Sequence, residues 1–559
     1  MPLTTALYTG LSGLTVNQVA LDVIGNNISN VNTYAFKGSR PLFDPEFSQT
    51  YNMGSAPGAV YGGSNPYQKG LGAVTSGIQR DFGQGNIKPT KAGDMAIQGD
   101  GMFVLDGPQR SYTRNGAFQV NSAEYLVSGD GNYLLGYGVD KNFNVIPGKL
   151  QRIQIPKDMV IVQPTSEMQL QGDLNPSGIV ATQGTVLQST AIQMSDGSAV
   201  LDTSHLVDLL NASGLQMFNV GDTLTLSADR GGNTAPTQTM VVSDTTSVGD
   251  LMNMMAGNMG VNTDPSLPKP GGCGIQDLGN GQYAMVITGN VGAANALKVD
   301  SLTSSFSTVG IPSFSQTQAA VGESVETTQS VYDSLGNKVA LDLTFVYQSK
   351  NAAGGTTWRF FANSPDNSGG SSMVGTGTAN FDAKGNFINS TGGTVSINRS
   401  GSGALSPLDI SLNMDLVQAV SPENSSATST MTALSQDGYA AGTFDTYSVS
   451  GDGMIEAAFS NGQKRTLGQV ALATFGNYAG LIDAGNNTFV PGPDSGDATI
   501  GTPTNNGAGV IKDGSLETSN VDISTEFVDL ITTSAGFSAS SRVITTANTL
   551  LTDLLSIMR

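Results

Sequence analysis

Residues 21–37 read LDVIGNNISNVNTYAFK, a run that begins apolar and then becomes rich in Asn. Asn side chains hydrogen-bond to nearby backbone groups and tolerate left-handed conformations, so they end helices and start turns. The run therefore predicts a helix that breaks into a loop within residues 25–37. We expect the Phe36 ring to anchor the exit from this loop against a partner.

Apolar residues outward from this loop recur at heptad spacing, and the C-terminal end of the chain shows the same spacing. From about residue 522 to residue 558 there is no Pro and one Gly, Gly536. A helix of that length is about 55 Å long, and either Asp522 or Ser524 can cap its start. The two seams consist of Leu7, Leu14, Leu21, Ile24 and Ile28, and of Phe527, Leu530, Phe537, Ile544, Leu551 and Leu555.

Small or polar residues such as Gly10 and Asn17 interrupt both seams, and we expect them to weaken an isolated helix pair. A terminal helix with no core beneath it gains little stability from its own propensity. It becomes stable when copies from neighbouring subunits bury its seam, which couples folding to assembly. Two interpretations stay open: self-association through the termini, or two ordinary amphipathic helices that pack on a globular core.

The region between the ends predicts short strands joined by tight turns. Pairs such as those at 100–101, 130–131 and 452–453 read Asp-Gly, which is typical of hairpin turns. Residues 185–320 read differently, with a strand expected at 220–226 and a short capped helix at 247–255. The sequence thus predicts a mainly β multidomain protein with α-helical N- and C-terminal segments, in which β domains are joined by a small α+β insertion.

Composition excludes several classes of function. The 559 residues carry a formal charge of −20, so the chain lacks the basic surface that binds nucleic acid or anionic lipid. No run approaches the ~18 apolar residues of a membrane-spanning helix. The first cationic residue is Lys37, so we expect no cleavable secretory signal.

Catalytic chemistry has few candidate residues. Nucleophilic catalysis of the Ser-His-Asp or Cys-His kind would need His205, which we place on the surface at a helix start, or Cys273, which we place in a Gly-rich loop. One Cys excludes an internal disulfide framework and a multi-cysteine metal site, and one His argues against a His-based metal cluster. We therefore expect no enzyme activity, no catalytic residue, no cofactor and no metal. A secreted hydrolase that uses two carboxylates stays open as a weak alternative.

Five stretches resemble the flagellar rod and hook family. The first is the Asn-rich loop at 25–37, which ends in Phe-Lys as it does in that family. The resemblance adds Asn26, Asn27, Asn30, Asn32 and Phe36 to the seam residues as an expected assembly interface. The other stretches are GNIKPT running to GDGMFV (85–104), YTRNGAF (112–118), GQVALA running to Gly480-Leu481 (468–481) and LETSNVD (516–522).

The resemblance implies a nested arrangement, in which the chain passes out through each domain and back. Within this family, the length of the chain implies a hook subunit, because rod proteins of this kind are much shorter. The expected segments are an N-terminal helix and linker (1–80), the first half of an inner β domain (81–150), the first part of a middle β domain (151–184), an inserted outer domain (185–320), the rest of the middle domain (321–440), the second half of the inner domain (441–510) and a C-terminal core helix (511–559).

The resemblance also implies partners and a location. The expected partners are further copies of the chain in a helical polymer, the distal rod, hook cap and hook-filament junction proteins, and the flagellar export apparatus. The expected location is the extracellular hook of a bacterial flagellum, reached without a cleaved signal. Another axial protein of the flagellum, of the distal rod or hook-associated type, and an extracellular β-rich adhesin are the alternatives.

Overall fold

The computed structural model describes residues 2–306, 310–420 and 428–557. The chain divides into two compact units, and it crosses between them twice. Unit 1 comprises residues 1–159 and 443–559, and unit 2 comprises residues 160–442. Strands make up 45% of the structure, and α-helices form both ends of the chain, which confirms the predicted fold class.

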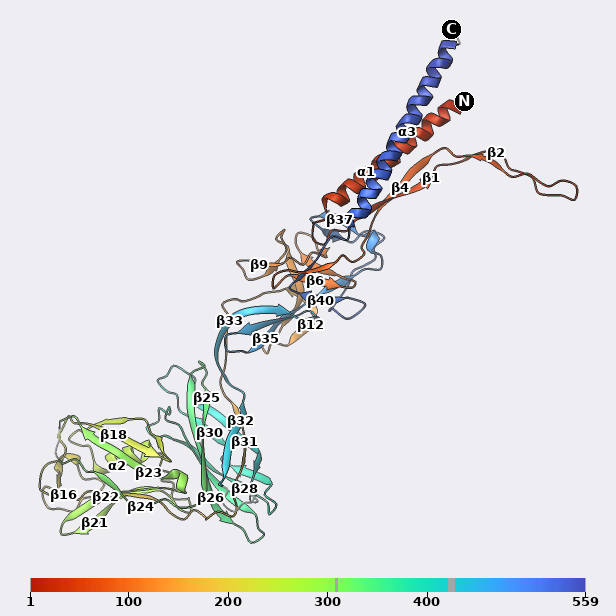
Figure 1. Ribbon diagram of the computed structural model, residues 1–559. Helices are drawn as coiled ribbons and strands as arrows, with labels where there is room; N and C mark the ends of the chain where they lie inside the picture. The colour runs from red at the N-terminus through yellow and green to blue at the C-terminus, as the bar shows by residue number, and fades with distance from the viewer. Residues whose placement is uncertain (1, 307–309, 421–427, 558–559) are drawn as a thin grey trace. The chain divides into compact units, whose positions relative to one another are not determined.

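Two antiparallel helices of unit 1 lie side by side, with both termini of the chain at the same end (Figure 1). They are α1 (Pro2–Ser29) and α3 (Ile523–Ile557). Of the two predicted caps, the structure uses Asp522, whose carboxylate accepts the Ser524 N–H at 2.8 Å. The Asn30 side chain donates to the Asn26 carbonyl at 3.0 Å, so an Asn ends α1 as predicted.

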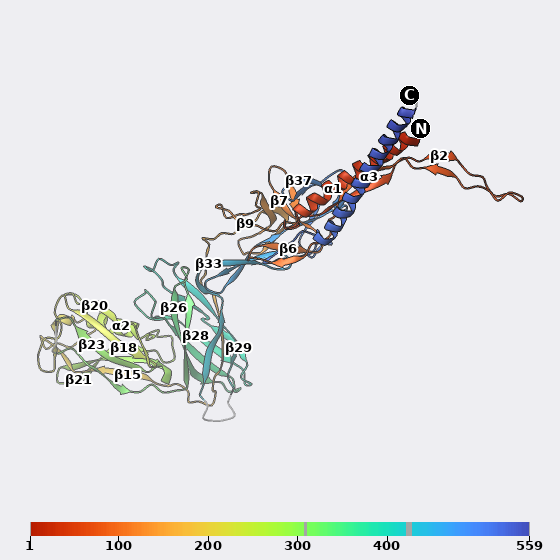
Figure 2. The same cartoon turned by 45° about the horizontal axis from the view of Figure 1, so that its top comes forward.

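A long β ribbon follows α1 where the sequence predicted only a linker to residue 80. Its inner half pairs β1 (Ser39–Pro45) with β4 (Ala73–Arg80), and its outer half pairs β2 (Gln49–Asn52) with β3 (Tyr67–Lys69). The period-two alternation of AVTSGIQR in β4 is the strand signal that the linker interpretation missed. The outer half projects from unit 1 in both views (Figures 1 and 2).

The β body of unit 1 is built from both halves of the chain. In its sheet β11 (Tyr133–Val139) pairs with β35 (Lys464–Val470), and β7 (Met102–Asp106) pairs with β36 (Leu472–Thr474). Two further pairs join β6 (Met95–Gln98) to β40 (Val510–Asp513) and β5 (Ile87–Pro89) to β41 (Ser515–Glu517). The other strands are β8 (Ser111–Thr113), β9 (Gln119–Val120), β10 (Leu126–Val127), β12 (Val145–Arg152), β33 (Tyr439–Val449), β34 (Met454–Phe459), β37 (Ile482–Gly485), β38 (Thr488–Val490) and β39 (Thr499–Gly501).

The larger part of unit 2 is a sandwich of two sheets. A four-stranded sheet has the order β30 (Thr394–Ile397), β31 (Leu408–Gln418), β14 (Glu167–Asp173) and β32 (Thr430–Gln436). A five-stranded meander runs through β25 (Ser324–Tyr332), β26 (Lys338–Lys350), β27 (Thr356–Asn363), β28 (Met373–Phe381) and β29 (Phe387–Thr391). The shared core contains Trp358, the only Trp of the chain, which is fully buried and stacks on Tyr347.

The insertion has a core of its own, which two small sheets and one helix enclose. The helix α2 (Val248–Asn258) has a capping box, in which the Asp250 N–H donates to Ser247 Oγ and the Ser247 N–H donates to Asp250 Oδ2. This confirms the predicted capped helix. The strands of the insertion are β15 (Gly184–Ser189), β16 (Ile192–Met194), β17 (Leu209–Asn211), β18 (Thr223–Arg230), β19 (Asn233–Thr234), β20 (Gln238–Val241), β21 (Gly272–Gly279), β22 (Gln282–Val291), β23 (Leu297–Ser304) and β24 (Phe314–Gln318).

Two residues that the sequence singled out lie in the insertion. His205 is exposed and precedes the short 3-10 helix Leu206–Asp208, as predicted. The Gly-rich loop predicted around Cys273 is wrong, because Cys273 lies in β21 and pairs with Ile287. The neighbouring Gly272 and Gly274 have no side chain that would hinder backbone pairing with β22. The Cys273 thiol packs on the core of the insertion. Burial raises the pKa of this thiol to about 11, so it is a poor nucleophile.

Ser247→Ala is expected to lower the free energy of unfolding of unit 2 by about 1 kcal/mol, because the cap of α2 loses its acceptor. Trp358 fluorescence during urea unfolding measures the loss, since the only Trp lies in this unit. The matched control is Ser213→Ala, which changes an exposed Ser of the same insertion. Equal unfolding midpoints for the two variants would contradict the role of the cap.

Candidate assembly interface

Helices α1 and α3 approach each other closely where one of them carries a Gly. A Cβ atom at Gly13 would lie 2.7 Å from Ser540 Oγ, and one at Gly10 would lie 2.9 Å from Ile544 Cγ1. A Cβ atom at Gly536 would lie 2.9 Å from Asn17 Oδ1. These small residues allow the two backbones to come together, and the expectation that they weaken an isolated pair stays a prediction.

The structure gives the predicted interface residues different surroundings. Within the chain, Ile24, Asn27 and Phe36 are buried. Leu7, Leu14, Leu21, Ile28, Asn30, Leu530, Ile544 and Leu551 are half-buried, and Asn26, Asn32, Phe527, Phe537 and Leu555 are exposed. Residues of the first group belong to the subunit's own packing, whereas those of the last group are free to meet another molecule.

Two Asn side chains join the end of α1 and the loop after it to the start of α3 and the segment before it. The Asn27 amide donates to the Ser39 carbonyl at 2.8 Å and to Glu526 Oε1 at 2.9 Å. The Asn520 amide donates to the Asp81 carbonyl at 2.9 Å, and its oxygen accepts the Gly38 N–H at 2.8 Å. These contacts fix the first turn of α3 beside the last turns of α1.

The left-handed residue of the loop is Ala35, with φ of 57°, and not one of the Asn residues. Its N–H donates to the Glu517 carbonyl at 2.8 Å. Backbone strain of this kind persists where surrounding contacts hold it. The Phe36 ring that follows is buried in unit 1, so it anchors the loop within the subunit.

A buried ionic cluster, formed by Lys37, Arg114 and Glu517, lies below the helices and is called the anchor cluster here. Lys37 Nζ lies 2.7 Å from Glu517 Oε1, and Arg114 Nε lies 2.8 Å from Glu517 Oε2. The Gly85 N–H donates to Glu517 Oε1 at 2.8 Å, and Lys37 Nζ also donates to the Gly83 carbonyl at 2.7 Å. Three segments far apart in sequence therefore meet at one carboxylate.

The remaining hydrogen-bonding groups of the anchor cluster bind the β body. Arg114 Nη1 donates to the carbonyls of Gly99 and Gly101 at 2.7 and 2.8 Å. Buried charges cost several kcal/mol to desolvate, and good geometry with further hydrogen bonds is what offsets that cost. The cluster meets this requirement, so it fixes the position of the loop after α1 on the β body.

The titration of the anchor cluster follows from burial and charge together. Burial alone would raise the pKa of Glu517, but Arg114 and Lys37 outweigh it and hold that pKa below its ordinary value of 4.5. Burial lowers the pKa of the Lys37 ammonium group, and Glu517 offsets this in part. The carboxylate thus stays ionised to lower pH in the folded chain than in the unfolded chain.

The stability that Glu517 provides is expected to disappear in acid. A carboxyl whose pKa is lowered by folding stabilises the fold fully above its unfolded pKa, and loses this effect as the pH falls through the folded pKa. The difference in unfolding free energy between wild type and Glu517→Gln should therefore be constant above pH 4.5 and shrink below it. Circular dichroism during urea unfolding from pH 7 to pH 3 measures it. A difference that does not change with pH would contradict the assignment.

Unit 1 leaves many apolar side chains uncovered on its helices and ribbon. Single exposed apolar residues are normal, whereas contiguous sets mark interaction surfaces. The exposed ones are Tyr8 and Leu11 on α1; Ile523, Phe527, Val528, Ile531, Phe537, Val543, Leu550, Leu554, Leu555 and Ile557 on α3; and Leu42, Phe43, Phe47, Tyr51, Met53, Val60, Tyr61, Tyr67, Val74 and Ile78 on the ribbon and its loops.

Four family models match the chain, and together they cover more than half of it. A model described as flagella basal body rod protein matches residues 7–37. The flagellar hook protein FlgE/F/G D1 domain matches 96–187, and the flagellar basal body protein FlaE D2 domain matches 301–439. The flagellar basal body rod FlgEFG protein C-terminal model matches 512–557.

Curated relatives named as hook proteins match over nearly the full length. The flagellar hook protein FlgE of Treponema pallidum is 27% identical over 99% of both chains, and that of Borreliella burgdorferi is 26% identical over 98% of both. The chain belongs to the flagellar hook protein family. A crystal structure of the Helicobacter pylori flagellar hook protein FlgE2 is 17% identical and has a TM-score of 0.41, covering 77% of this chain and 100% of that chain.

The hook protein family is a structural family and not an enzyme family. Among the described residues, no group of three or more His, Cys, Asp or Glu side chains is placed to hold a metal ion. The helices of the described chain are all too short or too polar to cross a bilayer.

The anchor cluster is the part of the site that sequence reasoning missed. Lys37, Arg114 and Glu517 each lie inside a stretch that carries the resemblance to the hook protein family. The available signal was that three charges occur in mostly uncharged motifs of a chain with only 13% charged residues. Charges in such surroundings are seldom buried without a partner.

Proposed function

We propose that this chain is the structural subunit of a bacterial flagellar hook and polymerises through α1 and α3. In this proposal the helices of neighbouring copies form the wall of a curved, flexible tube, which transmits motor torque to the filament. The observation that carries the proposal is a pair of terminal helices fixed to the β body at one end and rich in uncovered apolar side chains along its length.

Energetics support assembly through these helices. Burying apolar surface contributes about 25 cal/mol per Å², and α3 alone exposes ten large apolar side chains over its 35 residues. Contacts between different surfaces of identical subunits generate open helical filaments when the rotation does not close. The predicted interface residues Phe527, Phe537 and Leu555 are exposed in the single chain, where such contacts can reach them.

The proposal includes the partners and the route that the family resemblance implies. The ends of such a tube would meet the distal rod, the hook cap and the hook-filament junction proteins. The subunit would leave the cell through the flagellar export apparatus with its chain uncleaved. Family membership places the chain in the flagellum, and the extracellular hook is the specific location that we propose.

A rod protein and an adhesin are the alternative functions. Relatives named as hook proteins match nearly the whole chain, the insertion included, which favours the hook over the rod. An adhesin would not need two terminal helices that share one anchor on the β body. We therefore propose the hook subunit alone.

Electron cryomicroscopy of tubes assembled from the full-length chain tests this function. The expected reconstruction has residues 2–29 and 523–557 as the innermost layer around a channel. A tube whose channel is lined by strands of either unit would contradict the proposal, and so would a chain that forms no tubes under any assembly condition.

A further inference from the structure

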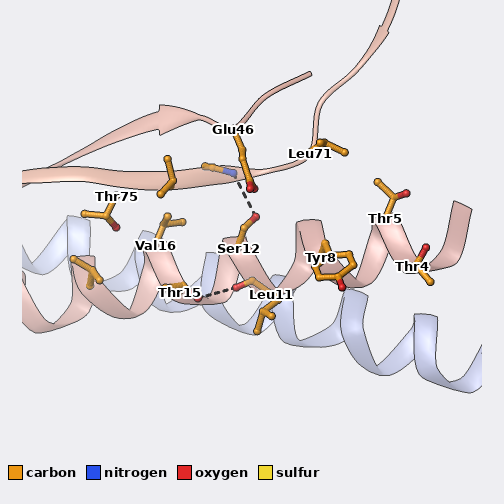
Figure 3. A pocket seen from close by; sticks show the side chains of 13 residues that line it. Thr4, Thr5, Tyr8, Leu11, Ser12, Thr15, Val16, Glu46, Leu71 and Thr75 are labelled. Carbon is orange, nitrogen blue, oxygen red and sulfur yellow. Dashed lines mark hydrogen bonds between the residues drawn. The ribbon is translucent and has the colours of Figure 1, made fainter. Parts of the chain in front are cut away.

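A groove of about 690 Å³ lies between α1 and the inner half of the ribbon. Figure 3 shows the side chains that line it. Its apolar walls come from both elements and include Tyr8 and Leu11 of α1, and Leu71 and Val74 of the ribbon segment. Tyr8, Leu11 and Val74 are more than half exposed.

Polar contacts and one close backbone approach join the ribbon segment to α1 beneath the groove. The Ala73 N–H donates to Ser12 Oγ at 3.3 Å, and the Thr9 hydroxyl, which donates to the Thr5 carbonyl at 2.9 Å, lies 3.4 Å from the Leu71 carbonyl. Gly72 has φ of +133°, and a Cβ atom there would lie 2.1 Å from Ser12 Oγ. The ribbon is therefore attached to α1 along the floor of the groove, which leaves the groove's mouth free.

The subunit's own α3 cannot fill this groove. Gly10, Gly13 and Asn17 face α3. Tyr8, Ser12 and Val19, which line the groove, lie roughly 140° around the helix at 3.6 residues per turn. The two helices would have to separate before α3 could reach the groove.

Helix α3 carries an apolar stripe that the described part of its own chain leaves largely uncovered, although Val543 at one end lies beside Gly10 of α1. Val543, Leu550, Leu554 and Ile557 are spaced by seven, four and three residues, so they share one face of the helix. Each is exposed, from 46% at Val543 to 79% at Ile557. Anchors at i, i+4 and i+7 are the pattern by which an amphipathic helix binds an apolar groove.

The end of this stripe extends beyond α1. The neighbours Gly10 with Ile544 and Gly13 with Ser540 fix the antiparallel register of the helices. In that register α3 passes the first turn of α1 at about residue 552. Figures 1 and 2 both show the C-terminal turns of α3 extending past α1.

One charged residue beside the stripe can pair with one in the groove. Glu46 is the one charged residue that lines the groove. Arg542, next to Val543, is the one Lys or Arg in residues 523–557 of α3, and the stripe itself carries one acid, Asp553, beside Leu554. An occupant that offers the Val543 end of the stripe therefore brings a cation that can pair with Glu46.

From this match we propose that the groove between α1 and the ribbon of one copy binds the Val543–Ile557 stripe of a second copy. The inference rests on the proposed function and specifies the contact that joins subunits. Groove and stripe are different surfaces of one chain, so each bound copy leaves one of each free. This arrangement lets the polymer grow at its ends.

Crosslinking between two single-Cys variants tests the docking. Both variants carry Cys273→Ser; one adds Leu554→Cys on the stripe and the other Val74→Cys on the groove. After co-assembly and treatment with a short bismaleimide, dimers are expected from the mixture and not from either variant alone. Leu434→Cys, at an exposed position of unit 2, is the matched control for Val74→Cys and should give no dimer.

Charge reversal provides a second test that does not depend on new thiols. Glu46→Lys and Arg542→Glu are each expected to raise the concentration needed for assembly by up to about fivefold, and the double variant should restore it. Tubes that form without crosslinks at Val74→Cys would overturn the docking and leave the proposed function standing. Charge reversals whose effects add would do the same. A wild-type chain that forms no tubes would overturn both.

Discussion

Glu517→Gln is expected to destabilise unit 1 by about 3–5 kcal/mol, because removing one partner leaves buried charges unpaired. The Arg114 guanidinium and the Lys37 amine would lose their carboxylate partner in a site where the side chains of all three residues are almost fully buried. The loss would fall on the junction that fixes both terminal helices. The same change should therefore lower the yield of tubes as well as the stability of the monomer.

Urea unfolding followed by two signals measures this loss. Far-UV circular dichroism reports both units, whereas Trp358 fluorescence reports unit 2 alone. We expect the variant to gain an early transition by circular dichroism, with the Trp358 transition unchanged. The control is Asp497→Asn, which removes an exposed acid of unit 1. A loss below about 1 kcal/mol, the usual limit for a surface pair, would show that the cluster is not an anchor.

Gly116→Ala is expected to destabilise unit 1 by about 3 kcal/mol or more, since overpacking against a rigid backbone is at the costly end of its range. A Cβ atom at Gly116 would lie 1.6 Å from the Met95 carbonyl oxygen. The Met95 N–H donates to the Gly116 carbonyl at 3.0 Å, so neither segment can move without breaking this contact. Arg114 of the anchor cluster precedes Gly116 by two residues in the sequence.

The matched control for Gly116→Ala is Gly129→Ala, at a turn of the same unit where an added Cβ atom meets nothing within 4 Å. Differential scanning calorimetry of both variants gives the comparison. We expect a lower Tm for the unit 1 transition of Gly116→Ala and a nearly unchanged Tm for the control. Similar Tm values would mean that the close approach at Gly116 is not a constraint on the fold.

The sequence was informative about the terminal helices because their signal is local. Heptad spacing predicted both of them, and the Asp522 cap and the end of α1 at Ser29 follow from residues only a few positions away. The α2 capping box is local in the same way, since Ser247 and Asp250 lie three residues apart. Patterns within about one turn of helix are visible without a structure.

The contacts that assemble the site are not local, and they escaped prediction for that reason. Lys37 and Glu517 are separated by 480 residues, and Asn27 and Glu526 by 499. Nothing in either segment indicates its partner. The close fit of the two helices is non-local in the same way, because Gly10 reads as a gap in its seam until the opposing helix is in place.

The ribbon and Cys273 show a different limit of sequence reasoning. Residues 39–80 and 272–279 both contain Gly within short runs, and such composition reads as linker or loop. Each run forms a strand because a neighbouring strand accepts its backbone hydrogen bonds: β4 for β1, and β22 for β21. Strand propensity depends on this context more than helix propensity does.

The central claim is that the terminal helices drive assembly while the rest of the chain folds without them. Electron microscopy of the full-length chain beside a version that lacks residues 1–35 and 520–559 tests it most directly. The shortened version keeps Lys37, Arg114 and Glu517, so its β body retains the anchor cluster. We predict tubes from the full-length chain, and monomers with native Trp358 fluorescence from the shortened one. Tubes from the shortened chain, or a full-length chain that stays monomeric with α1 and α3 already protected from hydrogen exchange, would contradict the account.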